Sequence, residues 1–403
     1  MQFKAATAPR ALIPLLSLAS ALSPFGMVVV VPTLSEVGRR YGIGSAETQF
    51  LISAYLFGLG AAQPFSGLLC DRLGRRPVLL GGFLLFVAAS LGCAAIRDID
   101  WLIALRFLQA VGVSVGTVAS RAVVRDTHDE EGTAAALAII AAAMGIAPVI
   151  APVVGGVLGG TAGPQSVFVA SALLGVVVLL AVWWRLPETR RAGQTPAVNL
   201  QSTLRDYRHL LGSRVFMGYT LMFGFVQGGF FTFLAVGATV FERDLGLGQQ
   251  TFGLVWGGMA FAYILGASAA GRLTRQMGMN RTIYVGMFFT CVAGWGLLAL
   301  ALTVGISLVP LASLLALLTA ASGLVIPGSM AGAVSFRPEI AGTSSGLSSA
   351  LGLVLSGAFA ILSGVIYTGN FTPIALLMAA GATLTAISGW MVRGAAASEA
   401  GEG

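Results

Sequence analysis

Long apolar runs separated by short polar breaks follow one another along almost the whole 403-residue chain. A transmembrane helix needs about 20 consecutive apolar residues, and each run supplies that length. Because a backbone in lipid must satisfy its own hydrogen bonds, each run is expected to be helical. The pattern predicts an all-α polytopic membrane protein with twelve transmembrane helices, at residues 11–34, 46–69, 77–96, 100–124, 132–158, 164–186, 214–241, 248–271, 281–303, 306–330, 341–367 and 371–393.

The two halves of the chain carry a similar polar turn between apolar runs. Residues 67–76 read Gly-Leu-Leu-Cys-Asp-Arg-Leu-Gly-Arg-Arg, and residues 271–281 read Gly-Arg-Leu-Thr-Arg-Gln-Met-Gly-Met-Asn-Arg. An internal repeat of this kind is typical of membrane transporters. The predicted domains are an N-terminal six-helix bundle at 1–186, a cytoplasmic linker at 187–213, a C-terminal six-helix bundle at 214–393 and a disordered tail at 394–403.

Composition and charge agree with a membrane protein. Hydrophobic residues make up 56% of the chain and charged residues 10%, against about 25% charged in ordinary globular domains. All but five of the 23 Lys and Arg residues fall on the same side of the predicted spans as the N-terminus. Because positive residues favour the cytoplasmic side, both termini are expected in the cytoplasm. The net charge of +7 therefore reflects topology, and no nucleic-acid partner is predicted.

Residues 67–76, the charged turn, combine glycines with closely spaced charges. Gly67 and Gly74 permit a tight bend, and Asp71 can bond the N-terminus of a neighbouring helix. The basic side chains can anchor the turn at phosphate headgroups, and they are Arg72, Arg75 and Arg76. Plain topology signalling is the alternative explanation. The spacing D-R-x-G-R-R resembles the signature of the major facilitator superfamily, where it is a gate latch between helices 2, 3 and 11.

Arg106 places a charge within the otherwise apolar residues 102–112. A charge there costs about 3 kcal/mol on insertion scales, so Arg106 is expected to face a cavity and to be functional. The alternative is that Arg106 snorkels to the membrane surface, since the helix starts near Trp101. The spacing R-x-x-Q-x-x-G, which includes Gln109, is similar to the superfamily's helix-4 motif. In that motif the arginine is linked to proton coupling.

The fifth predicted helix carries two prolines followed by paired glycines. Prolines remove backbone donors and glycines let another helix approach closely, which predicts a kinked, tightly packed helix at a moving interface, with a merely bent helix as the alternative. The pattern A-P-x-x-A-P-x-x-G-G is similar to the antiporter motif of drug-efflux members, and its key residues are Pro148, Pro152, Gly155 and Gly156.

Two further stretches narrow the resemblance. One follows the fourth predicted helix and includes Arg121, Arg125 and Asp126, which we expect to assist gating, and the other is residues 341–346. Together with the helix-5 pattern they resemble the bicyclomycin- and chloramphenicol-resistance (Bcr/CflA) group of drug:proton antiporters. That resemblance implies a multi-pass protein of the bacterial inner membrane, and nothing in the sequence requires more than a monomer.

One departure from that group concerns proton coupling and substrate charge. Members usually carry an aspartate in helix 1 a few residues before a proline, but residues 27–32 here read Met-Val-Val-Val-Val-Pro. None of the 16 acids falls at mid-membrane, so proton coupling stays open, and a neutral or anionic amphiphile is favoured over a cationic drug. The candidates for substrate binding or coupling are Arg106, Gln109, Tyr55, Gln63, Tyr219, Gln227 and Tyr263. Each aromatic or glutamine is equally compatible with helix packing.

The function implied is a secondary active transporter that exports a phenicol-like antibiotic or similar molecule by alternating access. An importer of a metabolite or siderophore on the same fold is the alternative, and a membrane enzyme or scaffold is the third. A protease would need catalytic groups inside the membrane, but His128 and His209 lie in predicted loops. No G-x-x-x-x-G-K-[ST] motif occurs, so a gradient is expected to supply the energy. No cofactor or metal is predicted, and the partners are a small-molecule substrate, the lipid bilayer and, if coupled, protons.

Overall fold

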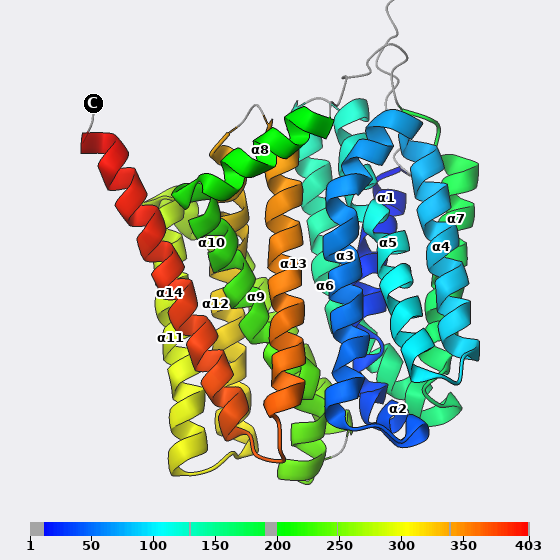
Figure 1. Ribbon diagram of the computed structural model, residues 1–403, viewed down its shortest axis with the longest axis vertical. Coiled ribbons are helices and arrows are strands. Elements are labelled where there is room, and N and C mark those ends of the chain that lie inside the picture. The colour runs from blue at the N-terminus through cyan, green and yellow to red at the C-terminus, as the bar shows by residue number, and fades with distance from the viewer. Residues whose placement is uncertain (1–11, 129, 190–199, 248, 338–339, 402–403) are drawn as a thin grey trace, which may run out of the picture. The chain divides into compact units, whose positions relative to one another are not determined.

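A computed structural model describes residues 12–128, 130–189, 200–247, 249–337 and 340–401, and no strand is assigned within these ranges. The helices of the first half are α1 (Leu12–Val28), η1 (Val31–Thr33), α2 (Leu34–Tyr41), α3 (Ser45–Leu73), α4 (Arg75–Ala95), α5 (Ile99–Thr127), α6 (Glu130–Ala162) and α7 (Ser166–Arg185). Those of the second half are α8 (Leu200–Gly212), α9 (Arg214–Thr239), the π-helix η2 (Val240–Asp244), α10 (Gln249–Met277), α11 (Met279–Thr303), α12 (Leu308–Ser335), α13 (Ala341–Ile366) and α14 (Thr372–Gly401) (Figure 1).

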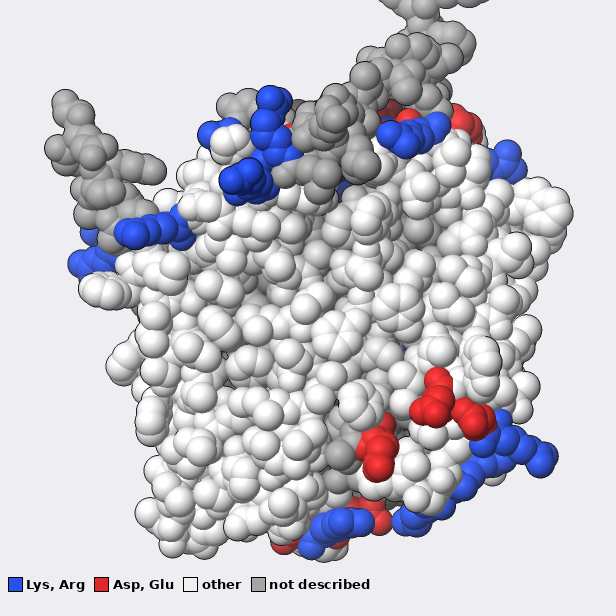
Figure 2. All heavy atoms as spheres, viewed as in Figure 1, with Lys and Arg blue, Asp and Glu red and all other residues white. Residues whose placement is uncertain are grey.

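The predicted all-α membrane fold is confirmed. In the described part of the chain, 11 helical segments are long and apolar enough to cross a membrane. The 29-residue α3 is not one of these segments, but it corresponds to the predicted span at 46–69. Every predicted span therefore corresponds to a helical segment. On the face drawn in Figure 2, charged side chains gather at the two ends of the helices and leave an uncharged band between them.

The helices form two compact units. In unit 1, residues 1–33 and 54–198, α1 packs against α5 and α6, and α4 packs against α5 and α7. In unit 2, residues 34–53 and 199–403, α9 packs against α13 and α14, and α12 packs against α10 and α11. The predicted boundaries differ at residues 34–53, because α2 contacts α9 and the Arg39 guanidinium lies 3.4 Å from the Glu242 carboxylate.

The first predicted span is broken. α1 ends at Val28 although the apolar run continues to Pro32. Pro32 has no N–H for the carbonyl four residues earlier, and its ring clashes with that turn, so an α-helix cannot continue unchanged. A short 3-10 helix follows, in which the Thr33 N–H and hydroxyl bond the Val30 carbonyl at 3.0 and 2.8 Å. The span is therefore two helical pieces with a break at residues 28–33.

Helices are assigned within both the predicted linker and the predicted tail. Within the predicted linker, α8 lies across the ends of α9 and α13 (Figure 1), whereas residues 190–199 are outside the described ranges. α14 is assigned to Gly401, and residues 394–401 of the predicted disordered tail therefore fall within its bounds. This segment is rich in alanine, the residue with the highest helix propensity. Residues 402–403 lie outside the described part.

The predicted repeat reappears in the backbone of two turns. Gly74 caps α4 with φ 100° and ψ 157°, and Gly278 caps α11 with φ 88° and ψ 160°. Residues with a Cβ rarely adopt such angles, so both positions favour glycine for the same reason. The two units therefore place equivalent residues of the repeat in nearly the same conformation.

Candidate functional site

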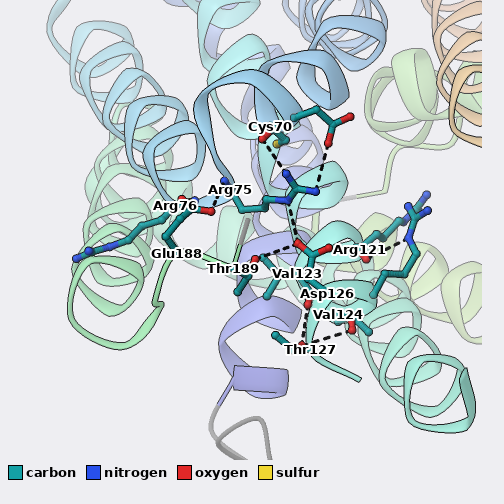
Figure 3. A network of polar contacts seen from close by, with 12 residues as sticks. Cys70, Arg75, Arg76, Arg121, Val123, Val124, Asp126, Thr127, Glu188 and Thr189 are labelled. Carbon is teal, nitrogen blue, oxygen red and sulfur yellow. Dashed lines mark hydrogen bonds and ion pairs between the residues drawn. The ribbon is translucent and has the colours of Figure 1, made fainter. Parts of the chain in front are cut away.

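The charged turn lies where α3 ends and α4 begins, and the Arg75 side chain is its centre (Figure 3). Arg75 Nη2 lies 3.3 Å from Asp71 Oδ1, and Arg75 Nε lies 2.9 Å from Asp126 Oδ2 at the end of α5. Arg75 Nη1 also donates to the Cys70 carbonyl at 3.1 Å. With its side chain only 14% exposed, Arg75 ties the ends of α3, α4 and α5 together.

The acid at the N-terminus of α4 is Glu188, not the predicted Asp71. Its Oε1 accepts the backbone N–H of Arg75 at 3.0 Å, and its Oε2 accepts that of Arg76 at 3.1 Å. A carboxylate is favoured there because the first amides of a helix have no intrahelical partner and the helix dipole is positive at that end. Asp71 belongs to the last turn of α3 and pairs with the Arg75 side chain instead.

Glu188 lies in residues 187–213, which were predicted to be a linker, and it was not among the predicted site residues. The sequence feature that could have indicated its role is an acid that directly follows Pro187, close after the end of an apolar helix. Its neighbour Thr189 also enters the cluster, since its hydroxyl donates to Asp126 Oδ2 at 3.1 Å. Arg76 is held from the same side, because its Nη2 donates to the Trp183 carbonyl of α7 at 2.7 Å.

The other predicted gating residues lie at the same helix ends. Arg125 is exposed, and its Nε donates to the Arg121 carbonyl at 3.4 Å within α5. Arg72 is exposed near the end of α3. A Cβ on Gly67 would lie 3.9 Å from Val118, which is an ordinary contact distance. Packing therefore does not require glycine at position 67.

Arg106 of α5 lies at the break in α1. Its Nη1 donates to the Gly26 carbonyl at 3.0 Å, and its Nη2 lies 3.5 Å from the Met27 carbonyl. In a continuous helix these carbonyls would accept N–H groups four residues later, but α1 ends at Val28. The guanidinium thus caps the C-terminus of α1, where the helix dipole favours a cation.

Side chains from α3, α4 and α5 also belong to the Arg106 cluster. Arg106 Nη1 donates to Gln109 Oε1 at 2.6 Å, and Gln109 Nε2 donates to the Ser90 hydroxyl on α4 at 2.7 Å. The Arg106 Cζ lies 4.3 Å from the Tyr55 ring centroid, a cation–π distance, and the Tyr55 hydroxyl donates to the Ser23 carbonyl at 3.0 Å. The cluster joins α1, α3, α4 and α5 inside unit 1.

The Arg106 side chain is 0% exposed, and the partners named above belong to its own unit, so the expectation that it faces a cavity stays a prediction. Snorkelling is excluded by the same burial. The sequence singles out Arg106 by the cost of its charge, but Pro32, the local signal for the break in α1, does not indicate that Arg106 lies against that break. Carbonyl dipoles at that break offset part of the cost of burying the charge.

The helix-5 motif packs on the other side of the α1 break. A Cβ on Gly155 would overlap the Val29 carbonyl oxygen, and one on Gly159 would overlap the Thr33 side chain. Gly156 has more room, with Pro32 Cβ at 4.0 Å. The tight packing predicted for this helix therefore rests on Gly155 and Gly159. Both prolines of the motif, Pro148 and Pro152, lie within α6, which continues through them.

The remaining predicted binding residues are not part of the Arg106 cluster. Gln63 is half-buried on α3, and Tyr263 is half-buried on α10 of unit 2. Tyr219 donates its hydroxyl to Asn280 Oδ1 at 2.7 Å and packs against Gly332, which links α9 with α11 and α12. Gln227 Oε1 is buried on α9 and accepts no hydrogen bond from the described residues. Within those residues, no group of three His, Cys, Asp or Glu could hold a metal ion.

Comparisons with known proteins agree with this architecture. A family model described as Major Facilitator Superfamily matches residues 16–361. The chain is 31% identical to the chloramphenicol resistance protein of Pseudomonas aeruginosa over 290 residues, covering 71% of this chain and 67% of that protein. It is 27% identical to multidrug resistance protein D of Escherichia coli (strain K12) over 374 residues, covering 91% of this chain and 92% of that protein. A solved D-xylose-proton symporter shares the fold, with a TM-score of 0.72 at 13% identity over 94% of this chain and 96% of that one.

Proposed function

This chain belongs to the Major Facilitator Superfamily, and we propose that it exports a neutral or anionic amphiphilic small molecule by alternating access. Similarity to relatives named for chloramphenicol and multidrug resistance supports export. The absence of an acid at mid-membrane in the sequence supports a substrate without positive charge. We infer that both termini lie in the cytoplasm, because Lys and Arg favour that side of the membrane.

The charged turn carries the gating part of the proposal. Arg75 joins three helix ends through ion pairs that can break and re-form, with the Asp71 side chain 42% exposed and the Asp126 side chain 25% exposed. An arrangement of this kind can hold one conformation of unit 1 and release it at moderate energetic cost. We infer that Asp71, Asp126 and Arg75 form the latch on the cytoplasmic side.

A proton-coupled cycle requires a titrating group elsewhere than at mid-membrane. Asp126 at the end of α5 and Glu36 in α2 are the candidates, since both lie at helix ends. An importer of a metabolite or siderophore is the second candidate function. It is favoured by the valines at residues 28–31, where drug:proton antiporters of the resembling group usually carry an aspartate.

Export is tested by the accumulation of labelled chloramphenicol in cells that express the protein, with vector-only cells as the control. We expect lower accumulation in the expressing cells and a rise towards the control value when a protonophore is added. Accumulation at or above the control value would contradict export of this substrate. In that case, uptake of a metabolite mixture would be measured next, to test the importer.

Asp126→Asn is expected to impair transport more than Asp71→Asn. Asp126 Oδ2 forms an ion pair with Arg75 and accepts a hydrogen bond from Thr189, and Asp126 is the less exposed acid. Losing its charge therefore weakens both contacts, which we expect to cost about 1.5–3 kcal/mol, or roughly tenfold or more in rate. The more exposed Asp71 pair is worth about 1 kcal/mol or less, so an effect below about fivefold is expected. Initial efflux rates are compared at equal amounts of protein in the membrane.

The control for this comparison is Arg97→Gln, which alters an exposed charge in unit 1 that belongs to no predicted gating motif. It should leave the rate near that of the wild type. Equal loss in Asp71→Asn and Asp126→Asn, or a loss in Arg97→Gln as large as either, would contradict the assignment of the Asp126 contact as the stronger one in the latch.

A further inference from the structure

Two residues that follow α7, Glu188 and Thr189, form hydrogen bonds at the charged turn. Neither belongs to a predicted gating motif. Glu188 accepts two backbone N–H groups of α4, and Thr189 donates to the same Asp126 oxygen that meets Arg75 (Figure 3). In the sequence, residues 190–199 then lead from α7 of unit 1 to α8 of unit 2, and we call residues 186–199 the connection. The start of the connection is therefore attached to both α4 and α5.

Gly74 leaves the space that Glu188 occupies. A Cβ on Gly74 would lie 2.6 Å from Glu188 Oε2 and 2.9 Å from its Cδ. Gly278 has nearly the same backbone angles in the repeated turn, but a Cβ there would meet nothing within 4 Å. The backbone angles alone thus account for glycine at position 278, whereas position 74 must also accommodate a carboxylate.

The position of the second half that corresponds to Glu188 carries an apolar residue. Gly278 follows Gly74 by 204 positions (278 − 74), and the same offset from Glu188 leads to Val392. Val392 is a buried apolar residue that packs against Gly218 and cannot accept a hydrogen bond through its side chain. The carboxylate contact is therefore specific to the half of the chain whose end continues into the connection.

We propose that Glu188 is a positioning residue that fastens the start of the inter-unit connection to the charged turn. Any displacement of residues 188–189 acts on α4 through the two amides and on Arg75 through Thr189 and Asp126. The state of the latch and the position of the connection are thereby coupled. This coupling rests on the proposed transport function, whereas the fastening itself does not.

The fastening is tested by hydrogen–deuterium exchange on the full chain in lipid nanodiscs. Glu188→Ala should speed exchange of the Arg75 and Arg76 amides about tenfold, because a hydrogen bond to a charged acceptor is lost at each. Glu188→Gln should give a smaller increase, since its amide oxygen can still accept one N–H. Unchanged exchange in Glu188→Ala would overturn the proposal without any reference to transport.

A matched control uses a second glutamate at a helix start. Glu47 Oε2 accepts the Gly44 N–H at 2.6 Å near the start of α3, so Glu47→Ala removes a local carboxylate contact elsewhere. It should leave exchange at Arg75 and Arg76 as in the wild type. Acceleration there as large as in Glu188→Ala would show a general loosening and would overturn the specific role.

The space that Gly74 leaves for the Glu188 carboxylate is tested by comparing Gly74→Ala with Gly278→Ala. Both substitutions strain the same backbone angles, but only Gly74→Ala displaces the Glu188 carboxylate. Adding Glu188→Ala should therefore have little further effect on exchange at Arg75 and Arg76 in the Gly74→Ala background, while keeping its full effect in the Gly278→Ala background. An equal effect of Glu188→Ala in both backgrounds would contradict the role of Gly74 in accommodating the Glu188 carboxylate.

Transport then separates positioning from substrate contact. With labelled chloramphenicol as the probe, Glu188→Ala should lower the maximal efflux rate and leave KM within about twofold, because the residue acts through the latch and not on the substrate. A raised KM at an unchanged maximal rate would overturn the coupling. If the wild type does not transport the probe, export of that substrate fails, while the exchange results still decide whether Glu188 fastens the connection.

Discussion

Arg106→Ala is expected to abolish transport and to destabilise unit 1 by about 3 kcal/mol. The substitution leaves the carbonyls of Gly26 and Met27 without their guanidinium donor at a buried site, and it removes the cation from the Tyr55 ring. Each orphaned polar group costs about 1–3 kcal/mol. The thermal unfolding midpoint of the purified protein should fall by several degrees.

Two companion variants show whether the cap of α1 is responsible. Gln109→Met removes one acceptor of Arg106 but leaves both contacts to α1, so its destabilisation should be smaller. Arg106→Lys keeps a positive charge with fewer donors and should lie between alanine and the wild type. A midpoint for Arg106→Ala equal to that of the wild type would contradict the capping role, even if transport were lost.

Gly155→Ala is expected to have an effect of similar size, about 3 kcal/mol, through close packing rather than charge. The added methyl group would overlap the Val29 carbonyl, which is backbone and cannot rotate away, so α6 must move from the break in α1. We expect less folded protein in the membrane and a lower unfolding midpoint. Both can be measured by size-exclusion chromatography and thermal unfolding in detergent.

Gly145→Ala is the matched control, since it lies in the same helix and a Cβ there meets nothing within 4 Å. It should be neutral, or stabilising by up to about 1 kcal/mol, because alanine favours helix more than glycine does. Equal unfolding midpoints for Gly155→Ala and Gly145→Ala would contradict the close packing of α6 against the break in α1.

The helices could be predicted from the sequence because lipid leaves the backbone few alternatives. Each apolar run of sufficient length became a helix, and the repeated glycine turns became equivalent caps at Gly74 and Gly278. The tail combines small, polar residues, which predict disorder, with alanines, which favour helix, so its composition alone gives two opposite expectations. The break in the first span depends on Pro32, a local signal that hydropathy alone does not resolve.

The polar contacts were harder to predict from the sequence, because they depend on which helix ends lie close together in the fold. Asp71, Asp126 and Glu188 were each visible as acids near a helix end, but the sequence could not assign each to its cation or amide. Asp71 was given the role that Glu188 holds, since it lies nearer to Arg75 in sequence. The motif around Arg106 includes its side-chain partner Gln109, but its partners on α1 are backbone carbonyls, which every residue has and no motif can mark.

The capped break in α1 also bears on how the protein is made. The donor for the Gly26 carbonyl is 80 residues further along the chain. At about 5–20 residues per second, the ribosome needs roughly 4–16 s to add that length. α1 therefore enters the bilayer before its cap has been synthesised, and during that interval water or the insertion machinery must satisfy its terminal carbonyls. The first helix to insert is therefore capped only after α5 has been synthesised, so the N-terminal half cannot reach its final structure before Arg106 is in place.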